Sequence, residues 1–487
     1  MQPVNLFGLG LHADSSVLAS ENRLNCFYDL RTTETGKTIT VRGTPGSYPL
    51  VADPNMQPSG LHVVNNILYF VTPLGLFSLD TGGVLTYLAS GPVGHPYCMM
   101  ADNYIQLMIV TGSEGWIYNI GTGVMTQITD VNFPATTRNV TYASGRFLCV
   151  KRDTREVYCS DQLDGLSWTS ALGLPMFFTK EQSSDPAFTC VAQNGIVAVF
   201  GLDTIEFWQD AGLSPVPFQY IPGTTQGYGC KSRFSIKAVN DTTYFLGHGP
   251  QGGMGVFAIK GYTVTKVSTP DVDDIIKQWE VNGATFNYTH GTAYNAHGHD
   301  FYELTEGVFS PNIGSLLYDA TTGIWSTTCT DNTNNSQNPA PKVHDVFIST
   351  LFNGQVVFRA ENGSAGIYAM DVNAYNDSGA PVQRQVTTKH LRNNGNEFAI
   401  SELVLLMDTG EVPLGQDFHI TLEVSRDGGR TFGSPRPRTL GLTGQYKEPR
   451  VKWDRLGSAR DFVLRFTMTD PIPFVIAGAE WETSVNG

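Results

Sequence analysis

One octapeptide near the C-terminus has residue types and spacing that could carry chemistry. SRDGGRTF, Ser425 to Phe432, follows the S-x-D-x-G-x-T-F/W spacing of the Asp-box hairpin. Asp427 can accept hydrogen bonds from turn amides, and Gly428 and Gly429 can supply the positive φ of a tight turn. The motif therefore predicts a β-turn and does not by itself indicate a reaction.

Asp boxes occur in sialidases, which makes glycoside hydrolysis the main enzymatic alternative. Such an enzyme also needs an arginine triad for the substrate carboxylate, a Tyr/Glu pair and an acid in a central pocket. The sequence offers no place for that triad, because the box lies in the C-terminal part and Arg is scarce before it. A second box, SDQLDGLSW (160–168), is distorted. We therefore expect no catalytic residues and no enzymatic activity.

Two further stretches resemble ligand-binding patterns. AHGHD places His297 and His299 two residues apart, on one face if the segment is a strand, but no third metal ligand follows at a recognisable spacing. GPQGGMG (249–255) lacks the Lys-Ser/Thr of a phosphate loop, and no helix opens after it. We expect no metal and no cofactor, and we interpret GPQGGMG as a flexible hairpin tip. As a hypothesis, such a tip forms a movable gate, built on Gly249, Gly252, Gly253 and Gly255.

Composition indicates an all-β protein of two or three domains. Only 16% of the 487 residues are charged, and 51 Gly and 26 Pro mark many turns. The net charge is −14, and because residues 381–487 contain 13 basic and 13 acidic side chains, the whole deficit lies before them. Such a charge disfavours tight DNA binding through phosphate contacts.

The cysteines and the N-terminus indicate the cellular compartment in which the protein is made. Seven cysteines without a CxxC pair fit neither a zinc site nor a disulfide framework, so we expect buried free thiols. As an alternative, Cys149 and Cys159 could face each other across a hairpin. The N-terminus has no signal-peptide pattern, and no stretch reaches 18 apolar residues. We expect a protein made in a cytoplasm.

A loose repeat organises the chain from about residue 60. Segments 65–88 and 102–128 share the order LYFVT/LMIVT, GLFSLDTGG/GWIYNIGTG and VLTYL/VMTQI. Weaker copies follow, at 142–161, 191–210, 239–267, 293–327 and 345–371. Spacings of about 40 to 55 residues are typical of four-stranded propeller blades, which predicts a β-propeller of seven blades, or six if one segment is an insertion.

Other segments complete the expected architecture. TPDVDDIIKQWEVNG (269–283) predicts one helix, because its apolar residues recur at helical spacing and Gly283 can end it. TDNTNNSQNPAP (330–341) is a polar loop, and NDSGAP (376–381) marks a domain boundary. Three to five alternating strands after it predict a small β-sandwich. We expect an N-terminal arm with the first strands at 1–50, a β-propeller at 51–378 and a C-terminal β-sandwich or platform domain at 379–487.

Taken in order, several segments give the chain a family resemblance. The chain resembles the packaged-DNA stabilisation proteins, or tail nozzle proteins, of short-tailed bacteriophages. The matching segments are ENRLNCFYD (21–29), TPGSY (44–48), GLDTIEFWQDAG (201–212), GYGCKSRFSIKAVNDTTYFLG (227–247), STPDVDDIIKQW (268–279), GHDFYEL (298–304), LLYDATTGIWS (316–326) and the run from LEVSRDGG (422–429) to GAEWE (478–482).

The resemblance implies a structural virion protein without catalytic residues. In that family a β-propeller with an added β domain forms a ring, thought to be a hexamer, below the tail adaptor; it closes the portal channel and retains packaged DNA until ejection. The implied partners are copies of the chain, the adaptor and portal complex, and a tail fibre or spike, and double-stranded DNA passes without specific binding. The implied location is the virion tail, assembled in the host cytoplasm.

The alternative function is a glycan-binding or receptor-binding, sialidase-like propeller of a tail. Exposed aromatic side chains would serve it, and Trp208, Tyr220 and Tyr228 are candidates, although core packing is the competing interpretation.

A basic stretch near the C-terminus is the candidate partner site. Residues 421–465 contain ten Lys/Arg and five Asp/Glu. A solvated strand face would explain them, and the sharper hypothesis is docking onto an acidic surface of a neighbouring subunit, the adaptor or the tail fibre. The candidate residues are Arg426, Arg430, Arg436, Arg438, Lys447, Arg450, Lys452 and Arg455, and Arg460 and Arg465 complete the stretch.

Overall fold

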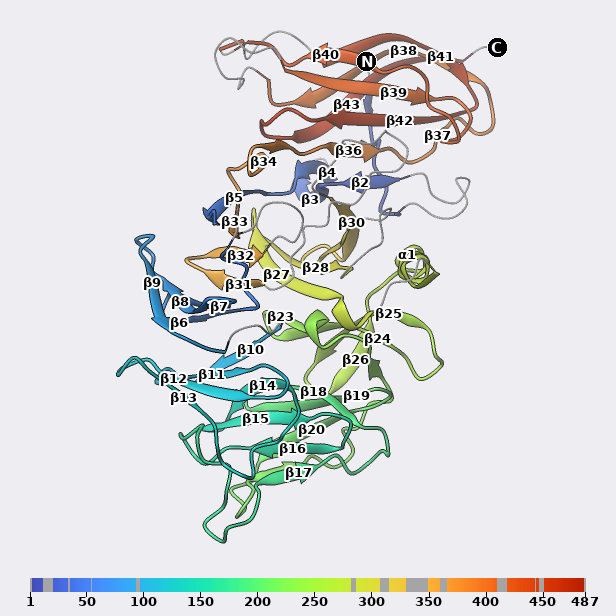
Figure 1. Ribbon diagram of the computed structural model, residues 1–487. Helices are drawn as coiled ribbons and strands as arrows, with labels where there is room; N and C mark the ends of the chain where they lie inside the picture. Colours follow the sequence, from blue (N-terminus) through green and yellow to red (C-terminus); the bar gives the residue numbers. More distant parts are fainter. Residues whose placement is uncertain are drawn as a thin grey trace.

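Two all-β parts, one above the other, make up the molecule in the computed structural model (Figure 1). A propeller forms the lower part, and a β-sandwich that contains both chain ends forms the upper part. The structure describes residues 2–11, 21–33, 36–53, 55–92, 97–281, 286–306, 315–329, 349–359, 366–409, 418–442, 444–445 and 451–485. In these ranges no helix is long and apolar enough to cross a membrane.

The described strands form seven antiparallel blades, which confirms the prediction of a propeller and its higher blade number. Blade 1 contains β6 (Gly60–Val64), β7 (Ile67–Thr72), β8 (Gly75–Leu79) and β9 (Leu85–Ala89), and blade 2 contains β10 (Met99–Asp102), β11 (Gln106–Val110), β12 (Gly115–Asn119) and β13 (Val124–Gln127). Blade 3 contains β14 (Thr137–Ala143), β15 (Arg146–Lys151), β16 (Glu156–Cys159) and β17 (Phe177–Thr179), and blade 4 contains β18 (Ala187–Gln193), β19 (Ile196–Gly201), β20 (Ile205–Asp210) and β21 (Phe218–Tyr220).

Blades 5 to 7 follow the same plan with additions. Blade 5 contains β22 (Gly229–Cys230), β23 (Lys237–Val239), β24 (Thr242–His248), β25 (Met254–Lys260) and β26 (Thr263–Lys266). Blade 6 contains β27 (His290–Ala296), β28 (His299–Thr305), β29 (Ser315–Asp319) and β30 (Ile324–Thr328), and blade 7 contains β31 (Ser349–Phe352), β32 (Gln355–Arg359), β33 (Ile367–Asp371) and β5 (Gly46–Val51). The hairpin of β34 (Asn376–Asp377) and β35 (Ala380–Pro381) extends the last blade. Blade 5 also contains the 3-10 turn η1 (Arg233–Ser235), and η2 (Phe286–Tyr288) precedes blade 6.

Each blade is apolar on both faces because it lies between two others. In β7, Leu68 and Phe70 belong to the core shared with blade 7, whereas Tyr69 and Val71 belong to the core shared with blade 2. This arrangement explains the near-continuous apolar runs such as ILYFVT, because a strand that is covered on both sides need not alternate.

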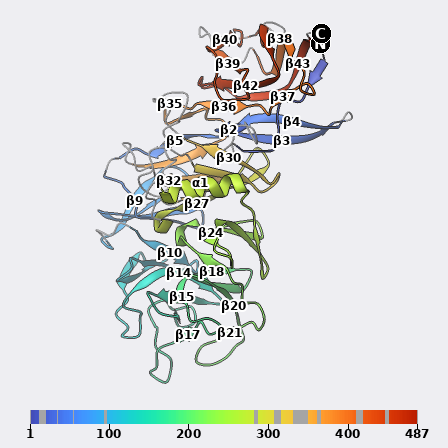
Figure 2. The same ribbon diagram turned by 90° about the vertical axis from the view of Figure 1, so that its right-hand side faces the viewer.

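The N-terminal strand β5 completes the ring. It pairs antiparallel with β33, with Ser47 opposite Met370, so the last blade combines both ends of the propeller segment. The first strands of the blades line the inside, and β31 of blade 7 contacts β6 of blade 1. The predicted helix is present as α1 (Pro270–Val281), whose buried Val272, Ile276 and Trp279 cover the core between blades 5 and 6 (Figure 2).

The upper part is a sandwich of two sheets around one core. One sheet has the order β3 (Cys26–Thr33), β4 (Gly36–Gly43), β43 (Val475–Val485), β38 (Phe398–Met407) and β41 (Val451–Ala459), with β1 (Gln2–Val4) on β43. The other contains β2 (Asn22–Leu24), β36 (Arg384–Thr387), β42 (Asp461–Met468), β39 (His419–Ser425) and β40 (Arg436–Thr439), with β37 (Leu391–Arg392) on β42. Their core contains Leu403 and Trp453 from the first sheet and Ile420 and Phe466 from the second.

A continuous sheet connects the two parts, and we call the residues that hold it the seam: Arg23, Asn25 and Arg384. Strand β2 pairs parallel with β30 of blade 6 and antiparallel with β36 of the sandwich. The buried Asn25 amide donates to the carbonyls of Cys329 and Gln383, at 2.8 Å each. Arg23 donates to the Trp325 carbonyl from Nε (3.2 Å) and Nη2 (2.5 Å). The propeller and the sandwich are thus joined by hydrogen bonds and not by a linker alone.

Several local predictions can be checked directly. All seven cysteines are buried thiols that form no disulfide, as expected. The loop predicted at 330–341 and the expected helix end at Gly283 lie outside the described residues. The sandwich has more strands than the three to five expected, because the segment after residue 381 alone forms the eight strands β36 to β43, and β1 to β4 from the N-terminal segment join them.

Candidate functional site

The Asp-box hairpin at the end of β39 forms by local hydrogen bonding, as the sequence predicts. Asp427 Oδ1 accepts from the backbone N of Arg430 (3.1 Å) and Thr431 (2.9 Å), and its Oδ2 accepts from Thr431 Oγ1 (2.6 Å). Gly428 and Gly429 have φ of 72° and 86°. Slight burial raises the pKa of Asp427, but the Thr431 and other hydrogen bonds outweigh it and lower the pKa to about 2. The carboxylate is therefore committed to the turn.

Beside this hairpin lies a row of cations that we call the basic edge: Arg426, Arg430, Arg436, Arg438, Lys452 and Arg455. Strands β40 and β41 are the edge strands of the two sheets, so part of their backbone lacks a partner strand. Arginine side chains supply donors to it. Arg438 Nε donates to the Lys452 carbonyl at 2.6 Å, and Arg426 donates to the Leu456 carbonyl from Nε (3.1 Å) and Nη2 (2.7 Å).

Two more contacts hold the edges together. Arg436 Nη1 donates to the Arg455 carbonyl at 3.4 Å, and Trp453 Nε1 donates to the Arg436 carbonyl at 2.8 Å. Gly457, with φ 90°, lets the Arg426 guanidinium lie flat on β41, since a Cβ there would come within 2.7 Å of Nη2. Three of the predicted partner-binding arginines therefore close the open side of the sandwich.

The other cations of the stretch differ in what they contact. Lys452 lies 3.6 Å from Glu402 and 3.5 Å from Asp454, and the half-buried Arg465 lies 3.5 Å from Glu423 and over the Phe432 ring. Among the described residues, Arg430, Arg455 and Arg460 are exposed and form no side-chain ion pair. Lys447 and Arg450 lie outside the described ranges.

The glycine-rich segment forms the hairpin between β24 and β25. Gly249 N donates to the Gly253 carbonyl at 3.2 Å, and a side chain at Gly252 or Gly253 would meet open space. Gly255 differs, because it lies in β25 and a Cβ there would come within 2.5 Å of Ser268 Oγ. The exposed tip is therefore 249–253, on the end of blade 5.

The prediction that His297 and His299 share one strand face is wrong. Ala296 pairs with His299, and His297 has φ 52°, so the chain reverses between the two histidines. His299 Nδ1 instead lies 2.7 Å from Asp319 Oδ2. Within the described ranges, His, Cys, Asp and Glu form no group of three or more that could hold a metal ion.

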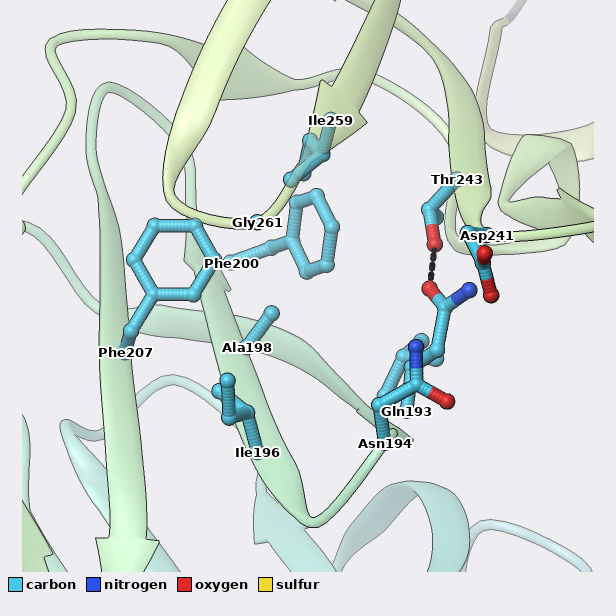
Figure 3. Close-up of a pocket in the computed structure, with 11 residues that line it drawn as sticks. Gln193, Asn194, Ile196, Ala198, Phe200, Phe207, Asp241, Thr243, Ile259 and Gly261 are labelled. Carbon is cyan, nitrogen blue, oxygen red and sulfur yellow. Dashed lines mark hydrogen bonds between the residues drawn. The ribbon is translucent and has the colours of Figure 1, made fainter.

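An apolar pocket lies between blades 4 and 5 (Figure 3). Phe200 and Phe207 of blade 4 and Ile259 of blade 5 supply its apolar lining, and the hydrogen-bonded pair of Gln193 and Thr243 lines one side. Its volume of about 60 Å³ accommodates a few waters and no sugar ring.

The aromatic candidates for glycan binding are mainly engaged in packing. Trp208 is buried in the core between blades 3 and 4, and Tyr220 packs against the same core and bonds Thr225. Tyr228 packs edge-on against Phe257 in the neighbouring core. The competing interpretation, core packing, is thus correct for Trp208. The side chains that sequence reasoning missed are those of the seam, because its contacts join residues about 300 positions apart, such as Arg23 and Trp325.

Comparisons with known proteins identify relatives of both parts. A family model described as bacteriophage P22 Gp10, β-propeller, matches residues 56–290, and a second, bacteriophage P22 Gp10, β-sandwich, matches residues 383–484. Together they cover more than half of the chain. No curated protein matches the sequence significantly.

Solved structures show more distant likeness. The extracellular domain of the hybrid two component system BT4673 from B. thetaiotaomicron aligns at a TM-score of 0.43 and 10% identity, over 75% of this chain and 44% of that chain. This chain thus spans less than half of that relative. A chain of the mitotic checkpoint complex aligns at a TM-score of 0.42 and 11% identity, over 67% of this chain and 94% of that chain.

Proposed function

The chain belongs to the bacteriophage P22 Gp10 family, and from this premise we propose that it is a structural protein of a phage tail. In this proposal several copies, six by analogy with the nozzle proteins that the sequence resembles, form a ring below the tail adaptor. The ring closes the portal channel, retains the packaged DNA and opens for ejection. The protein is assembled onto the virion in the host cytoplasm and catalyses no reaction.

The observation that carries this proposal is that both parts match family models of one phage protein. The propeller model covers 56–290 and the sandwich model 383–484, and the structure has a propeller and a sandwich over those ranges.

The seam supports a mechanical role. A subunit that resists DNA pressure in a closed channel needs its two parts to move together. Blade 6 continues through β2 and β36 into β42, so bending between the parts would break ladder hydrogen bonds. The buried side chains of Arg23 and Arg384 also bridge segments more than 300 residues apart, since Arg384 Nη2 donates to the Thr44 carbonyl at 3.4 Å.

Charge supports passive contact with DNA. The net charge of −14 arises entirely before residue 381, so the propeller would repel phosphates and would not hold DNA by counterion release. Retention would then depend on steric closure of the ring.

Docking of the ring is assigned to the exposed members of the basic stretch. Arg430, Arg455 and Arg460 have no ion pair in the described structure, so their charge is available to an acidic surface of the neighbouring subunit, the adaptor or the tail fibre. Reversing all three to Glu should block tail completion while the purified subunit remains folded. Arg426, Arg436 and Arg438 are poor test positions, since their loss would also open the sandwich edge.

The experiment that tests the function is deletion of the gene from its phage. We expect capsids that fill with DNA and then lose it, with tails that lack their distal tube in electron micrographs. The triple Arg430, Arg455 and Arg460 reversal should reproduce this defect, and an Arg→Gln triple should give a weaker one. Capsids that keep their DNA but fail to adsorb would overturn the nozzle role in favour of a receptor-binding propeller.

The gate hypothesis has its own test. Because the β24–β25 ladder ends at the pair of His248 and Met254, removal of residues 250–252 should leave it intact and shorten the tip to the two glycines 249 and 253. If the tip closes the channel, capsids carrying this deletion should leak DNA, whereas Gln251→Ser, which keeps the length, should not. Equal retention by both variants would reject the gate.

A further inference from the structure

The outer strands of blades 1 and 2 are exposed sheet edges. Strands β9 and β13 are the last strands of their four-stranded sheets, so one backbone edge of each has no partner strand in the described structure. Both lie on the left-hand side of the propeller in Figure 1. Leu88 of β9 and Met125 of β13 pack against the same core, between blades 1 and 2. We call these two strands, with Val84 before β9, the outer flank.

The outer flank is apolar and uncharged. Four of its large apolar side chains are at least 40% exposed: Val84, Leu85, Tyr87 and Val124. No Asp, Glu, Lys or Arg occurs in residues 81–101 or 115–129, which contain the two strands, although the propeller segment as a whole is acidic. Single exposed apolar side chains need no explanation, but a group of them marks an interaction surface.

The other blades protect or shorten their outer strands. Blade 6 continues from β30 into β2, and the β34–β35 hairpin extends blade 7. On blade 5, Lys266 of β26 forms an ion pair with Asp273 of α1. The outer strands β17 and β21 of blades 3 and 4 have three residues each, and Pro217 and Pro222 flank β21. Charge, proline and short length are the usual protections of a sheet edge, whereas β9 and β13 contain neither charge nor proline.

Both strands of the outer flank begin at a turn that a side chain fixes. Asp80 Oδ1 accepts from the backbone N of Gly82 and Val84, at 2.9 Å each, in the turn before β9. Asn119 Oδ1 accepts from the backbone N of Thr122 at 3.0 Å in the corresponding turn before β13. The exposed apolar side chains therefore start from defined backbone positions, which reduces the entropy lost when a partner binds.

Tyr87 has the properties of an interface anchor. Its ring packs edge-on against Phe77, with the ring centroids 5.3 Å apart. Gly75 lets the ring lie over β8, since a Cβ there would come within 3.0 Å of Tyr87 Cε2. Within the described residues the Tyr87 hydroxyl forms no hydrogen bond. A tyrosine with a fixed ring and an available hydroxyl is typical of the few side chains that dominate binding at an interface.

We propose that the outer flank is the surface on which a second copy of the chain packs in the ring. Contacts between copies of an acidic propeller bring like charges together, and burial of an uncharged surface avoids this repulsion. DNA and other polyanions do not fit, because the two strands present no cation. In a ring, the flank of one copy meets a different surface of the next copy. This inference rests on the proposed ring and names the surface at which its copies meet.

The test is photo-crosslinking in tails assembled by the phage. Tyr87→benzoylphenylalanine keeps an aromatic ring in the outer flank and reacts on irradiation with the chain that touches it. We expect a product of two copies of this chain, at about twice its mass of 53.2 kDa, and mass spectrometry identifies the segment that is bound. Val124→benzoylphenylalanine should react with the same partner, and it decides if the first variant fails to assemble.

Other crosslinked products would contradict the proposal. A product with the adaptor or a tail fibre would overturn it in favour of docking of that protein, and so would tails in which neither position reacts. A chain that is absent from purified virions would overturn the proposed function together with this inference. A chain that is present in tails without a crosslink between copies would overturn this inference alone.

Charge insertion gives a matched set of variants. Tyr87→Glu should lower the number of copies retained per tail about tenfold, because it buries an unpaired carboxylate in the contact. Tyr87→Phe, which keeps the surface apolar, should leave this number nearly unchanged. Val281→Glu, at the exposed end of α1, is the control for charge added elsewhere. Thermal unfolding of the purified subunits checks that all three remain folded, and equal losses from Tyr87→Glu and Val281→Glu would overturn the proposal.

Discussion

The basic edge of the sandwich and the cavity inside the propeller differ in where their basic side chains come from in the sequence. At the edge, Arg426 and Arg438 donate to backbone carbonyls of β41 and join two sheets. Inside the propeller, Lys237 of β23 and His290 of β27 line a cavity of about 210 Å³. The edge cations are close together in sequence, whereas those of the cavity lining are spread from position 62 to position 290. The cluster of basic residues in sequence thus contains three arginines that hold the edge of the sandwich, whereas the basic residues of the cavity lining are dispersed in sequence.

The largest expected effect on stability is at the seam between the propeller and the sandwich. Arg23→Met removes both donors to the buried Trp325 carbonyl and the guanidinium that lies 4.6 Å from the Tyr28 ring centroid. We expect a loss of about 3 kcal/mol in the free energy of unfolding, because a buried acceptor is left unpaired. Urea denaturation measures it, with the exposed Arg460→Met as control. A loss equal to that of the control would show that the seam contributes no stability.

The next prediction concerns Lys237, which lines the cavity inside the propeller. The pKa of Lys237 is lowered from 10.5 to about 8 by burial, so between these values the unfolded chain binds more protons and stability rises with pH. Lys237→Met should therefore be more stable than wild type at pH 7 by about 2 kcal/mol, and the difference should vanish by pH 10.5. Thermal unfolding from pH 7 to 10.5 measures it. A difference that is constant with pH would contradict a poorly solvated charge.

At the basic edge, two arginines give a matched pair. Arg438 and Arg430 are both exposed, but only Arg438 donates to a backbone carbonyl, that of Lys452, at 2.6 Å. Arg438→Met should lower the free energy of unfolding by about 1 kcal/mol, while Arg430→Met should leave it nearly unchanged. Chemical denaturation compares them directly. Equal effects would mean that the edge arginines act through charge alone.

The smallest expected effect is at Asp427. Its pKa is lowered from 3.8 to about 2, so the carboxylate contributes stability above pH 4 that is lost as the pH falls toward 2. Asp427→Asn should cost about 0.5 kcal/mol at pH 7, since the group is exposed and screened. The gap between the two proteins should close by pH 2 in acid-unfolding curves. A gap that persists there would assign the effect to turn geometry and not to the charge.

Local patterns in the sequence predicted the elements but not all of their positions. The repeat segments fall on the seven blades, helix α1 (Pro270–Val281) lies in the predicted segment 269–283, and Asp427 forms the predicted turn. The face shared by His297 and His299 was predicted wrongly, because a two-residue reversal at His297 and Gly298 leaves the residue order unchanged while ending the strand.

The sequence by itself determined what depends on neighbours along the chain: the blade period, the amphipathic helix, the Asp-box turn and the excess of acidic residues before residue 381. Only the tertiary structure decided the closure of blade 7 by β5, the seam from Arg23 to Trp325, the use of the edge arginines on β41 and the meeting of residues from several blades around the cavity inside the propeller. These features join residues tens to hundreds of positions apart, and no short-range period or spacing encodes such contacts. They depend on ring closure and on which sheet edges are left unpaired.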